Sequence, residues 1–177
     1  MGRKVSNHSR EKNMSENDIM MFSTTASNDR IVFLSGDVNE HSISAVITQL
    51  ISLANSQPTA PIYLIISTYG GSIDEMFSLY DTIKFLPCPV HTVALGKVMS
   101  AGVLLISSGC KGKRLIGKNA RIMMHPVSTG IAGNVFQVIN DCSETQRLQQ
   151  LMVDSLCTET KMTKEQVQEI MQKGYDH

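Results

Sequence analysis

The sequence predicts an α/β protein built around a parallel sheet, and three observations support this prediction. Short apolar runs at 31–34, 62–66 and 90–95 have the length and composition of buried strands. Apolar residues at helical spacing follow each run, and glycine or proline separates the segments. Strand and helix therefore alternate, which is typical of βαβ units with right-handed crossovers.

The first two strands enclose the first helix. The run 31–34 ends at Ser35 and Gly36, and apolar residues at helical spacing predict a helix over 40–55. Prolines interrupt the chain before the second strand, 62–66. This segment is therefore a complete predicted βαβ unit.

The second and third strands are followed by tight turns and further helices. The Tyr69-Gly70-Gly71 turn opens a helix that runs to Phe85. The third strand is expected over 90–95, with Gly96 behind it, and a short apolar helix over 99–107. Parallel sheets bind ligands at the carboxyl ends of their strands, so the turns after the second and third strands are predicted to form the site.

The last third of the chain contains short extended pieces and two helices. A basic turn and extended segments are expected over 111–125. Helical spacing predicts a long helix over 134–158 and a final helix over 163–173, which Thr163 opens with a capping box. A helix of ~25 residues is ~37 Å long, which exceeds the diameter of so small a domain. We therefore expect the helix to protrude and to pack against a partner.

Composition limits the domain organisation and the class of function. The 177 residues suffice for one domain, predicted over 30–177, and the Ser- and Asn-rich segment 1–29 is expected to be a flexible arm. Lys and Arg total 16 and so do Asp and Glu, which argues against a dedicated nucleic-acid binder. We expect no membrane span, because no apolar stretch approaches ~18 residues, and no secretory signal. The four cysteines lack zinc-binding spacing and are predicted to be reduced structural thiols.

Ser100 is the candidate nucleophile, because it lies at a strand-to-helix corner. A serine there is also a common helix N-cap, and its spacing alone does not exclude that role. Catalysis would need a base to activate the hydroxyl, a group to orient the base, and N–H donors facing an oxyanion. The N-terminus of the following helix and the Gly70-Gly71 turn can supply such donors.

His125 is the candidate base, at the end of an extended segment. A satisfied interior histidine is the alternative interpretation. The other histidines are weaker candidates: His8 lies in the arm, His177 is terminal, His41 opens a helix and His91 begins a strand.

The orienting acid is not determined by composition or spacing. Asp176 is penultimate, and terminal residues often fray. The other candidates are the aspartates Asp37, Asp74, Asp81, Asp141 and Asp154.

Six segments, in this order along the chain, resemble the ClpP family of self-compartmentalising serine proteases over roughly residues 18–177. The segments that carry the resemblance are 30–36, the Gly70-Gly71 turn, 80–83, the Met99-Ser100-Ala101-Gly102 corner, 109–114 and 119–125. The interval from Ser100 to His125 equals the family's nucleophile-to-base interval. The implied fold is the ClpP/crotonase-like superhelix of repeated βαβ units with a protruding handle helix.

The resemblance implies a role for each candidate residue. Ser100 becomes the nucleophile, His125 the base and Asp176 the orienting acid, and the N–H groups of Gly71 and Ala101 form the oxyanion hole. The implied substrate-binding residues are Gly70, Gly130 and Gly133. No metal or cofactor is implied, because ATP is used by a partner unfoldase.

The chain departs from the family's pattern at three places. Thr68-Tyr69 precedes the glycine pair where the family usually has Ser-Pro, and Pro126 follows His125 without the usual glutamine. The approach to the acid is about two residues longer, so an alignment without gaps places Gly174 at the aspartate position.

The resemblance also implies an assembly and a cellular setting. We expect heptameric rings stacked as a tetradecamer, an arm forming the axial gate, and an ATPase unfoldase that delivers unfolded polypeptide. Tyr63, Ile65, Phe85 and Leu115 occupy positions like those of the family's ATPase-docking pockets, or are ordinary core and interface residues. The implied location is cytoplasmic, namely the host cytoplasm for a viral protein or the stroma for a plastid one.

Two alternative functions belong to different classes. One is a catalytically weak ring subunit that regulates a complete homologue by mixed assembly. The other is a crotonase-like acyl-CoA enzyme, which would need carboxylates near its substrate rather than a Ser/His pair.

Overall fold

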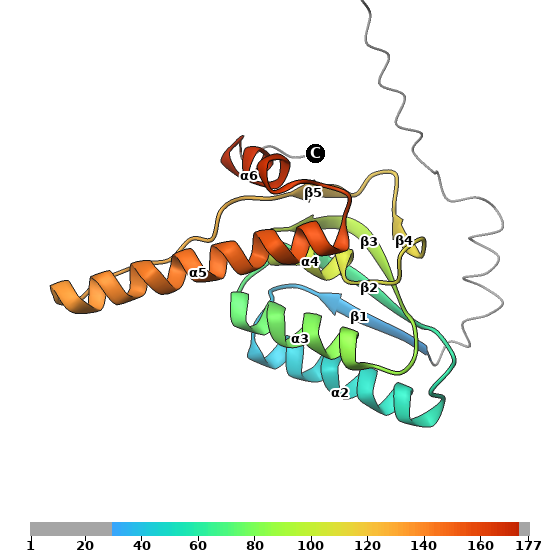
Figure 1. Ribbon diagram of the computed structural model, residues 1–177. Coiled ribbons are helices and arrows are strands. Elements are labelled where there is room, and N and C mark those ends of the chain that lie inside the picture. The colour runs from blue at the N-terminus through green and yellow to red at the C-terminus, as the bar shows by residue number, and fades with distance from the viewer. Residues whose placement is uncertain (1–29, 174–177) are drawn as a thin grey trace, which may run out of the picture.

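The computed structural model describes residues 30–173, so the predicted arm 1–29 and Asp176 lie outside the described residues. Its centre is a parallel sheet with strand order β1-β2-β3-β4, in which β5 also pairs with β3 (Figure 1). The strands are β1 (Ile31–Ser35), β2 (Ile62–Thr68), β3 (Val90–Met99), β4 (Arg114–Ile116) and β5 (Arg121–Met123). The predicted parallel α/β class is confirmed.

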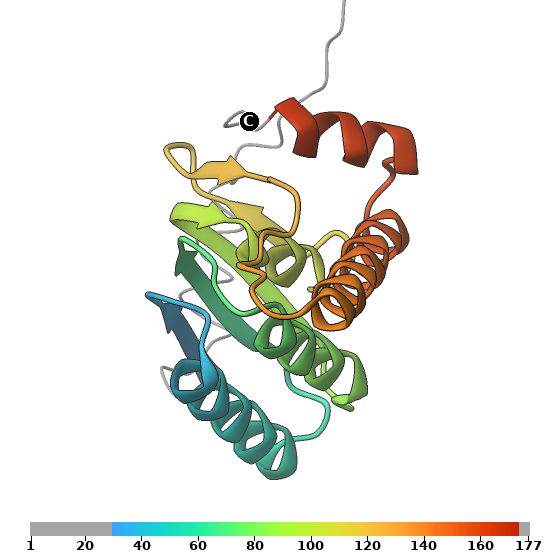
Figure 2. The same cartoon turned by 90° about the vertical axis from the view of Figure 1, so that its left-hand side faces the viewer.

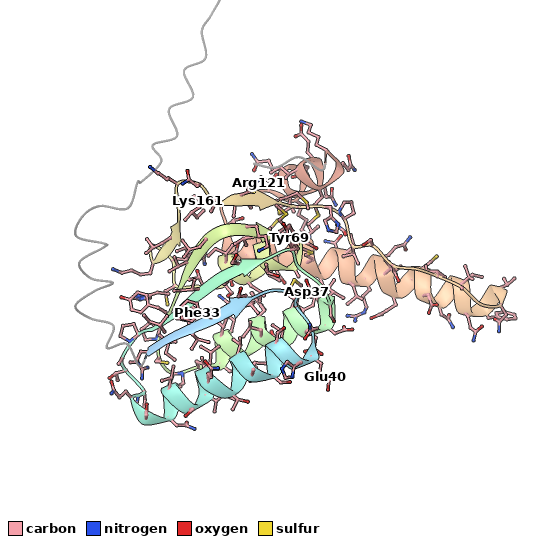
Figure 3. All side chains as sticks on the ribbon, turned by 180° about the vertical axis from the view of Figure 1, so that it is seen from behind. Phe33, Asp37, Glu40, Tyr69, Arg121 and Lys161 are labelled. Carbon is pink, nitrogen blue, oxygen red and sulfur yellow. The ribbon has the colours of Figure 1, made fainter. Side chains whose placement is uncertain are left out.

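The helices form a second layer on one face of the sheet, as the side view in Figure 2 shows. They are α2 (Glu40–Ser56), α3 (Ile73–Phe85), α4 (Ala101–Ser107), α5 (Val135–Glu159) and α6 (Lys164–Lys173). Within residues 30–173 no helix covers the opposite face, which Figure 3 views directly. There Phe33 and Tyr69 are 63% and 64% exposed.

The core lies between the two layers. Each fully buried Leu or Ile side chain contributes about 1.5–3 kcal/mol relative to an exposed one. The largest side chains buried there are Leu34, Ile43, Leu50, Ile62, Leu64, Ile66, Met76, Leu79, Leu104, Leu105, Leu156 and Met171.

The third strand is longer than the sequence predicts. We expected it to end before Gly96, but β3 continues to Met99. Gly96 has a φ of 64° and coincides with a shift in the pairing with β2, so it bends the strand without ending it. The second half of β3 then pairs with β5, and α4 begins two residues later than predicted.

The predicted long helix is confirmed as α5, and it extends well beyond the two layers (Figure 1). Asn134 and Gln137 form a capping box at its start, as Thr163 and Gln166 do for α6. The buried residues of α5, such as Met152 and Leu156, all lie in its second half. In the first half Val135, Phe136 and Ile139 are exposed.

Arg30 ties together several segments at the amino ends of β1 and β2. Its guanidinium donates hydrogen bonds to the carbonyls of Leu53, Gln57, Ala60 and Pro61. Two of these carbonyls, those of Leu53 and the C-cap residue Gln57, belong to the end of α2, and each also accepts a main-chain N–H. The buried guanidinium therefore joins the end of α2 to the loop that leads into β2.

Glu159 is the centre of a second polar cluster, at the end of α5. Its carboxylate accepts a hydrogen bond from the Tyr80 hydroxyl at 2.9 Å and pairs with Lys84 at 2.6 Å and Arg114 at 2.9 Å. Burial alone raises the pKa of this carboxyl, but the hydrogen bonds from Lys84 and Tyr80 and the charges of Lys84 and Arg114 hold it below its ordinary value. The cluster joins α5 to α3 and β4.

Candidate active site

Three strand ends meet at the carboxyl edge of the sheet. Strand β2 leads into the Gly70-Gly71 turn, β3 ends directly before Ser100, and β5 ends shortly before His125. The Ser100 N–H donates to the Met123 carbonyl at 2.8 Å. Because this bond joins the β3 corner to the end of β5, the two candidate residues lie at one edge although 25 positions separate them.

Ser100 has an unusual backbone conformation, with φ 53° and ψ −120°. It is the one residue other than glycine with a positive φ in the described part of the chain. Such a conformation costs about 1–3 kcal/mol and is found mainly at functional sites. Ser100 occupies the N-cap position of α4, but its hydroxyl makes no capping hydrogen bond. The N-cap interpretation therefore does not account for the serine side chain.

The Gly70-Gly71 turn lies against the Ser100 corner, and both positions require glycine. A Cβ on Gly70 would lie 2.6 Å from the Ser100 Cβ, and one on Gly71 would lie 2.2 Å from the Val38 carbonyl oxygen. Both residues also have positive φ, at 102° and 149°. The turn therefore brings main chain next to the serine, where a side chain would block the approach.

Among the described residues, 30–173, two main-chain donors at this corner have no main-chain partner. Val38 pairs with the turn through its N–H to Gly70 O and through its O to Ser72 N–H, which bypasses the Gly71 N–H. Ala101 is the first residue of α4, and N–H groups at the start of a helix have no partner within the helix. Both N–H groups are available to a ligand.

A pocket of about 280 Å³ brings the predicted residues together. Ser100, Ala101, Gly71 and His125 all line it. The remaining lining residues are Ser72, Ile73, Met76, Pro126, Val127, Ser128 and Met152. Sequence reasoning missed these, because Ile73, Met76 and Met152 belong to the helix faces of α3 and α5 and look like ordinary core residues.

His125 is half-buried at the pocket wall. Its Nδ1 lies 2.6 Å from the Pro126 carbonyl oxygen. A carbonyl oxygen can only accept, so Nδ1 is the donor in this contact, and in the neutral imidazole Nε2 is then the acceptor nitrogen. This is the tautomer that a general base needs.

The other candidates lie elsewhere or outside the described residues. Asp154 pairs with Lys164, and Asp74 and Asp81 line a separate groove between α3 and α5. Within residues 30–173 no carboxylate makes a hydrogen bond or ion pair with His125. Gly130 and Gly133 lie between His125 and α5 and do not line the pocket.

The remaining histidines also lie away from this site. His91 packs edge-on against Tyr63, and burial, helped by the charge of Lys113, lowers its pKa. His41 is in the first turn of α2, and His8 and His177 lie outside the described residues.

The four predicted docking residues differ in exposure. Tyr63 and Ile65 are buried, Leu115 is half-buried and Phe85 is 87% exposed.

In the range 30–173, no helix is long and apolar enough to cross a membrane, and no group of three or more His, Cys, Asp or Glu is placed to hold a metal.

A serine on a strained strand-to-helix corner, an imidazole in the same pocket and unpaired N–H groups beside them are typical of hydrolases that act by acyl transfer. Comparison with known proteins agrees with this class. A family model described as Clp protease matches residues 12–175. The chain belongs to the Clp protease family.

Curated relatives from Borreliella and Borrelia carry the same family name. The chain is 33% identical over 147 residues to the ATP-dependent Clp protease proteolytic subunit 1 of Borreliella burgdorferi, a match that covers 83% of this chain and 76% of the relative. The proteolytic subunits of Borreliella afzelii and Borrelia garinii subsp. bavariensis are also 33% identical over 83% of the chain, with 75% and 76% of the relatives covered. The predicted resemblance is confirmed, and the protease class is favoured over the crotonase-like alternative.

Proposed function

We propose that this chain is the proteolytic subunit of a self-compartmentalising, ATP-dependent serine endopeptidase. The single observation that supports it best is the pocket that Ser100, His125, Gly71 and Ala101 line together. In this proposal Ser100 is the nucleophile, His125 is the general base, and Asp176 is the orienting acid suggested by chain order. No metal or cofactor takes part.

The proposed reaction is acyl transfer. His125 Nε2 accepts the Ser100 proton as Oγ attacks the peptide carbonyl, and the N–H groups of Gly71 and Ala101 donate to the resulting oxyanion. His125 then protonates the leaving amine, and water repeats the sequence on the acyl-enzyme. Strain at Ser100 supports this role, because a positive φ turns the side chain away from the ordinary capping geometry.

We propose that the chain assembles into heptameric rings stacked as a tetradecamer. The first half of α5 supports this, because Phe136 is 80% and Val135 71% exposed on a helix that extends beyond the domain. The segment 130–133 would add a bound peptide as an extra strand, with Gly70 beside it. A Clp ATPase would deliver unfolded polypeptide in a cytoplasmic compartment, and mixed rings with a homologue are the alternative assembly.

A serine-directed fluorophosphonate tests the catalytic proposal. We expect one adduct, at Ser100, together with turnover of a small fluorogenic peptide. Ser128 lines the same pocket, so Ser128→Ala is the matched control and should keep the adduct, whereas Ser100→Ala should lose it. Absence of any adduct at Ser100 contradicts the proposal. An adduct without peptide turnover favours the weak ring subunit instead.

Sedimentation or mass photometry at micromolar concentration tests the assembly. We expect a ring-sized particle for the full chain and its dissociation in Phe136→Asp, which places a charge on the exposed apolar face of α5. Gln146 is also exposed on α5, so Gln146→Asp adds the same charge as a control and should leave the particle intact. A monomeric full chain would contradict the assembly proposal.

A further inference from the structure

We propose that His125 is oriented by a hydrogen-bond relay in which Gln149 of α5 holds the Pro126–Val127 peptide, and that peptide holds the imidazole. This inference rests on the proposed function of His125 as the base. It assigns Gln149 a positioning role in the reaction, although Gln149 does not line the pocket and belongs to none of the matched motifs.

The relay runs through a single peptide unit. The Val127 N–H donates to Gln149 Oε1 at 2.7 Å, and the carbonyl of the same peptide, from Pro126, lies 2.6 Å from His125 Nδ1. Every peptide bond in the described residues is trans. In a trans peptide the N–H and C=O point in opposite directions, so the bond to Gln149 directs the Pro126 carbonyl toward the histidine.

The far end of the relay is fixed by packing. Gln149 is half-buried on α5, and its Nε2 donates to the Met171 Sδ at 3.1 Å. This contact assigns Oε1 as the atom that faces Val127, because a thioether sulfur accepts and does not donate. Met171 is 1% exposed on α6, so a buried side chain holds the glutamine amide in one orientation.

The relay fulfils the two tasks that an orienting group has in a serine hydrolase. The Pro126 carbonyl accepts from Nδ1–H, so in the neutral imidazole Nε2 is the unprotonated nitrogen that a general base uses. Each hydrogen bond in a chain polarises the next, so donation by the Val127 N–H to Gln149 makes the Pro126 carbonyl a better acceptor. The relay therefore acts on the tautomer and the ring orientation of His125 from α5, in addition to the role proposed for Asp176.

Substitutions at Gln149 separate this role from simple packing. Gln149→Met keeps the volume and removes the acceptor, whereas Gln149→Glu keeps an acceptor oxygen for Val127. We expect Gln149→Met to lower kcat by about 10–100-fold with KM changed by less than about 3-fold, because a small misplacement of a catalytic group is costly. Gln149→Glu should recover most of the rate. Gln150 is exposed and pairs with Asp154, so Gln150→Met is the matched control and should behave like the parent.

A spectroscopic measurement keeps this test independent of turnover. The ¹⁵N signals of His125 in sedimented, ¹⁵N-histidine-labelled Ser100→Ala protein should show a protonated Nδ1 and a bare Nε2. Gln149→Met in that background should convert them to a mixture of tautomers. The relay is overturned if Gln149→Met leaves kcat and the Nδ1-protonated signal intact while Asp176→Asn removes both. A protein without Ser100-dependent turnover, whose His125 signals still respond to Gln149, contradicts the proposed function but retains the relay.

Discussion

The two ends of the sheet differ in how their polar groups are used. At the amino ends of the strands, Arg30 and Glu159 make dense hydrogen bonds that join helices to strands. At the carboxyl ends, Ser100 has a strained backbone, and within residues 30–173 the Gly71 and Ala101 N–H groups have no main-chain partner. The difference indicates that polar groups at the amino ends stabilise the fold, whereas those at the carboxyl ends, where the site is proposed, lower stability through strain and unpaired donors.

Replacing the strained serine should produce the largest separation of activity from stability. Ser100→Gly removes the proposed nucleophile and also relieves the positive φ. Peptidase turnover should fall by at least about 10⁴-fold. The free energy of unfolding should rise by about 1 kcal/mol, because glycine adopts φ 53° without strain. Parallel assays of turnover and thermal unfolding check both expectations. A lower stability of Ser100→Gly would contradict the inference that the Ser100 backbone is strained.

A methyl group on the glycine turn should reduce both activity and stability. In Gly70→Ala the new Cβ would meet the Ser100 Cβ at 2.6 Å, so the corner must shift. Turnover should fall by about 10²-fold, as expected for a displacement near 1 Å.

Gly36→Ala is the matched control for this change. Gly36 also has a positive φ, at 97°, and follows a strand, but nothing lies within 4 Å of the added Cβ. It should cost about 1–2 kcal/mol of stability from the backbone alone and leave turnover unchanged. Equal losses of turnover in the two variants would show that the contact with Ser100 is unimportant.

Removing the charge of Glu159 should lower stability and leave peptidase turnover unchanged, which is the opposite of the effect expected at Ser100. Glu159→Gln leaves Lys84 and Arg114 without their counter-charge and should lower the free energy of unfolding by about 2–3 kcal/mol. The exposed pair of Glu144 and Arg147 is the control, and Glu144→Gln should leave stability nearly unchanged, because solvent screens exposed ion pairs. Chemical denaturation at fixed protein concentration checks both.

The smallest expected effect is a dependence of stability on alkaline pH. Burial and then the hydrogen bond to Glu159 raise the pKa of Tyr80 from 10.0 to about 12. The unfolded chain loses this proton first, so the stabilisation is complete below pH 10.0 and is lost as pH rises toward about 12. Tyr80→Phe should remove this component. Identical stability profiles for the two proteins between these pH values would contradict the assignment.

Much of the fold follows from local patterns that the sequence displays. The apolar runs, the glycine and proline breaks and the capping box at Thr163 predicted the elements to within a few residues, because these signals act over short range. Strand β3 is the exception. Gly96 ends a strand in most local contexts, but pairing with β5, a segment distant in sequence, carried β3 on to Met99.

The candidate site, like the fold, was predicted from the sequence only in part. The sequence by itself predicted Ser100, His125 and the glycine pair as site residues, because the motifs that contain them carried the family resemblance, whereas residue type alone left a helix N-cap and an interior histidine as alternatives. Only the tertiary structure decided that Ser72, Met76, Val127 and Met152 line the pocket, and that Gln149 contacts the peptide after His125. Such contacts depend on how α3, α5 and α6 pack against the sheet, and helical periodicity shows which face of a helix is apolar but not which distant residue it meets.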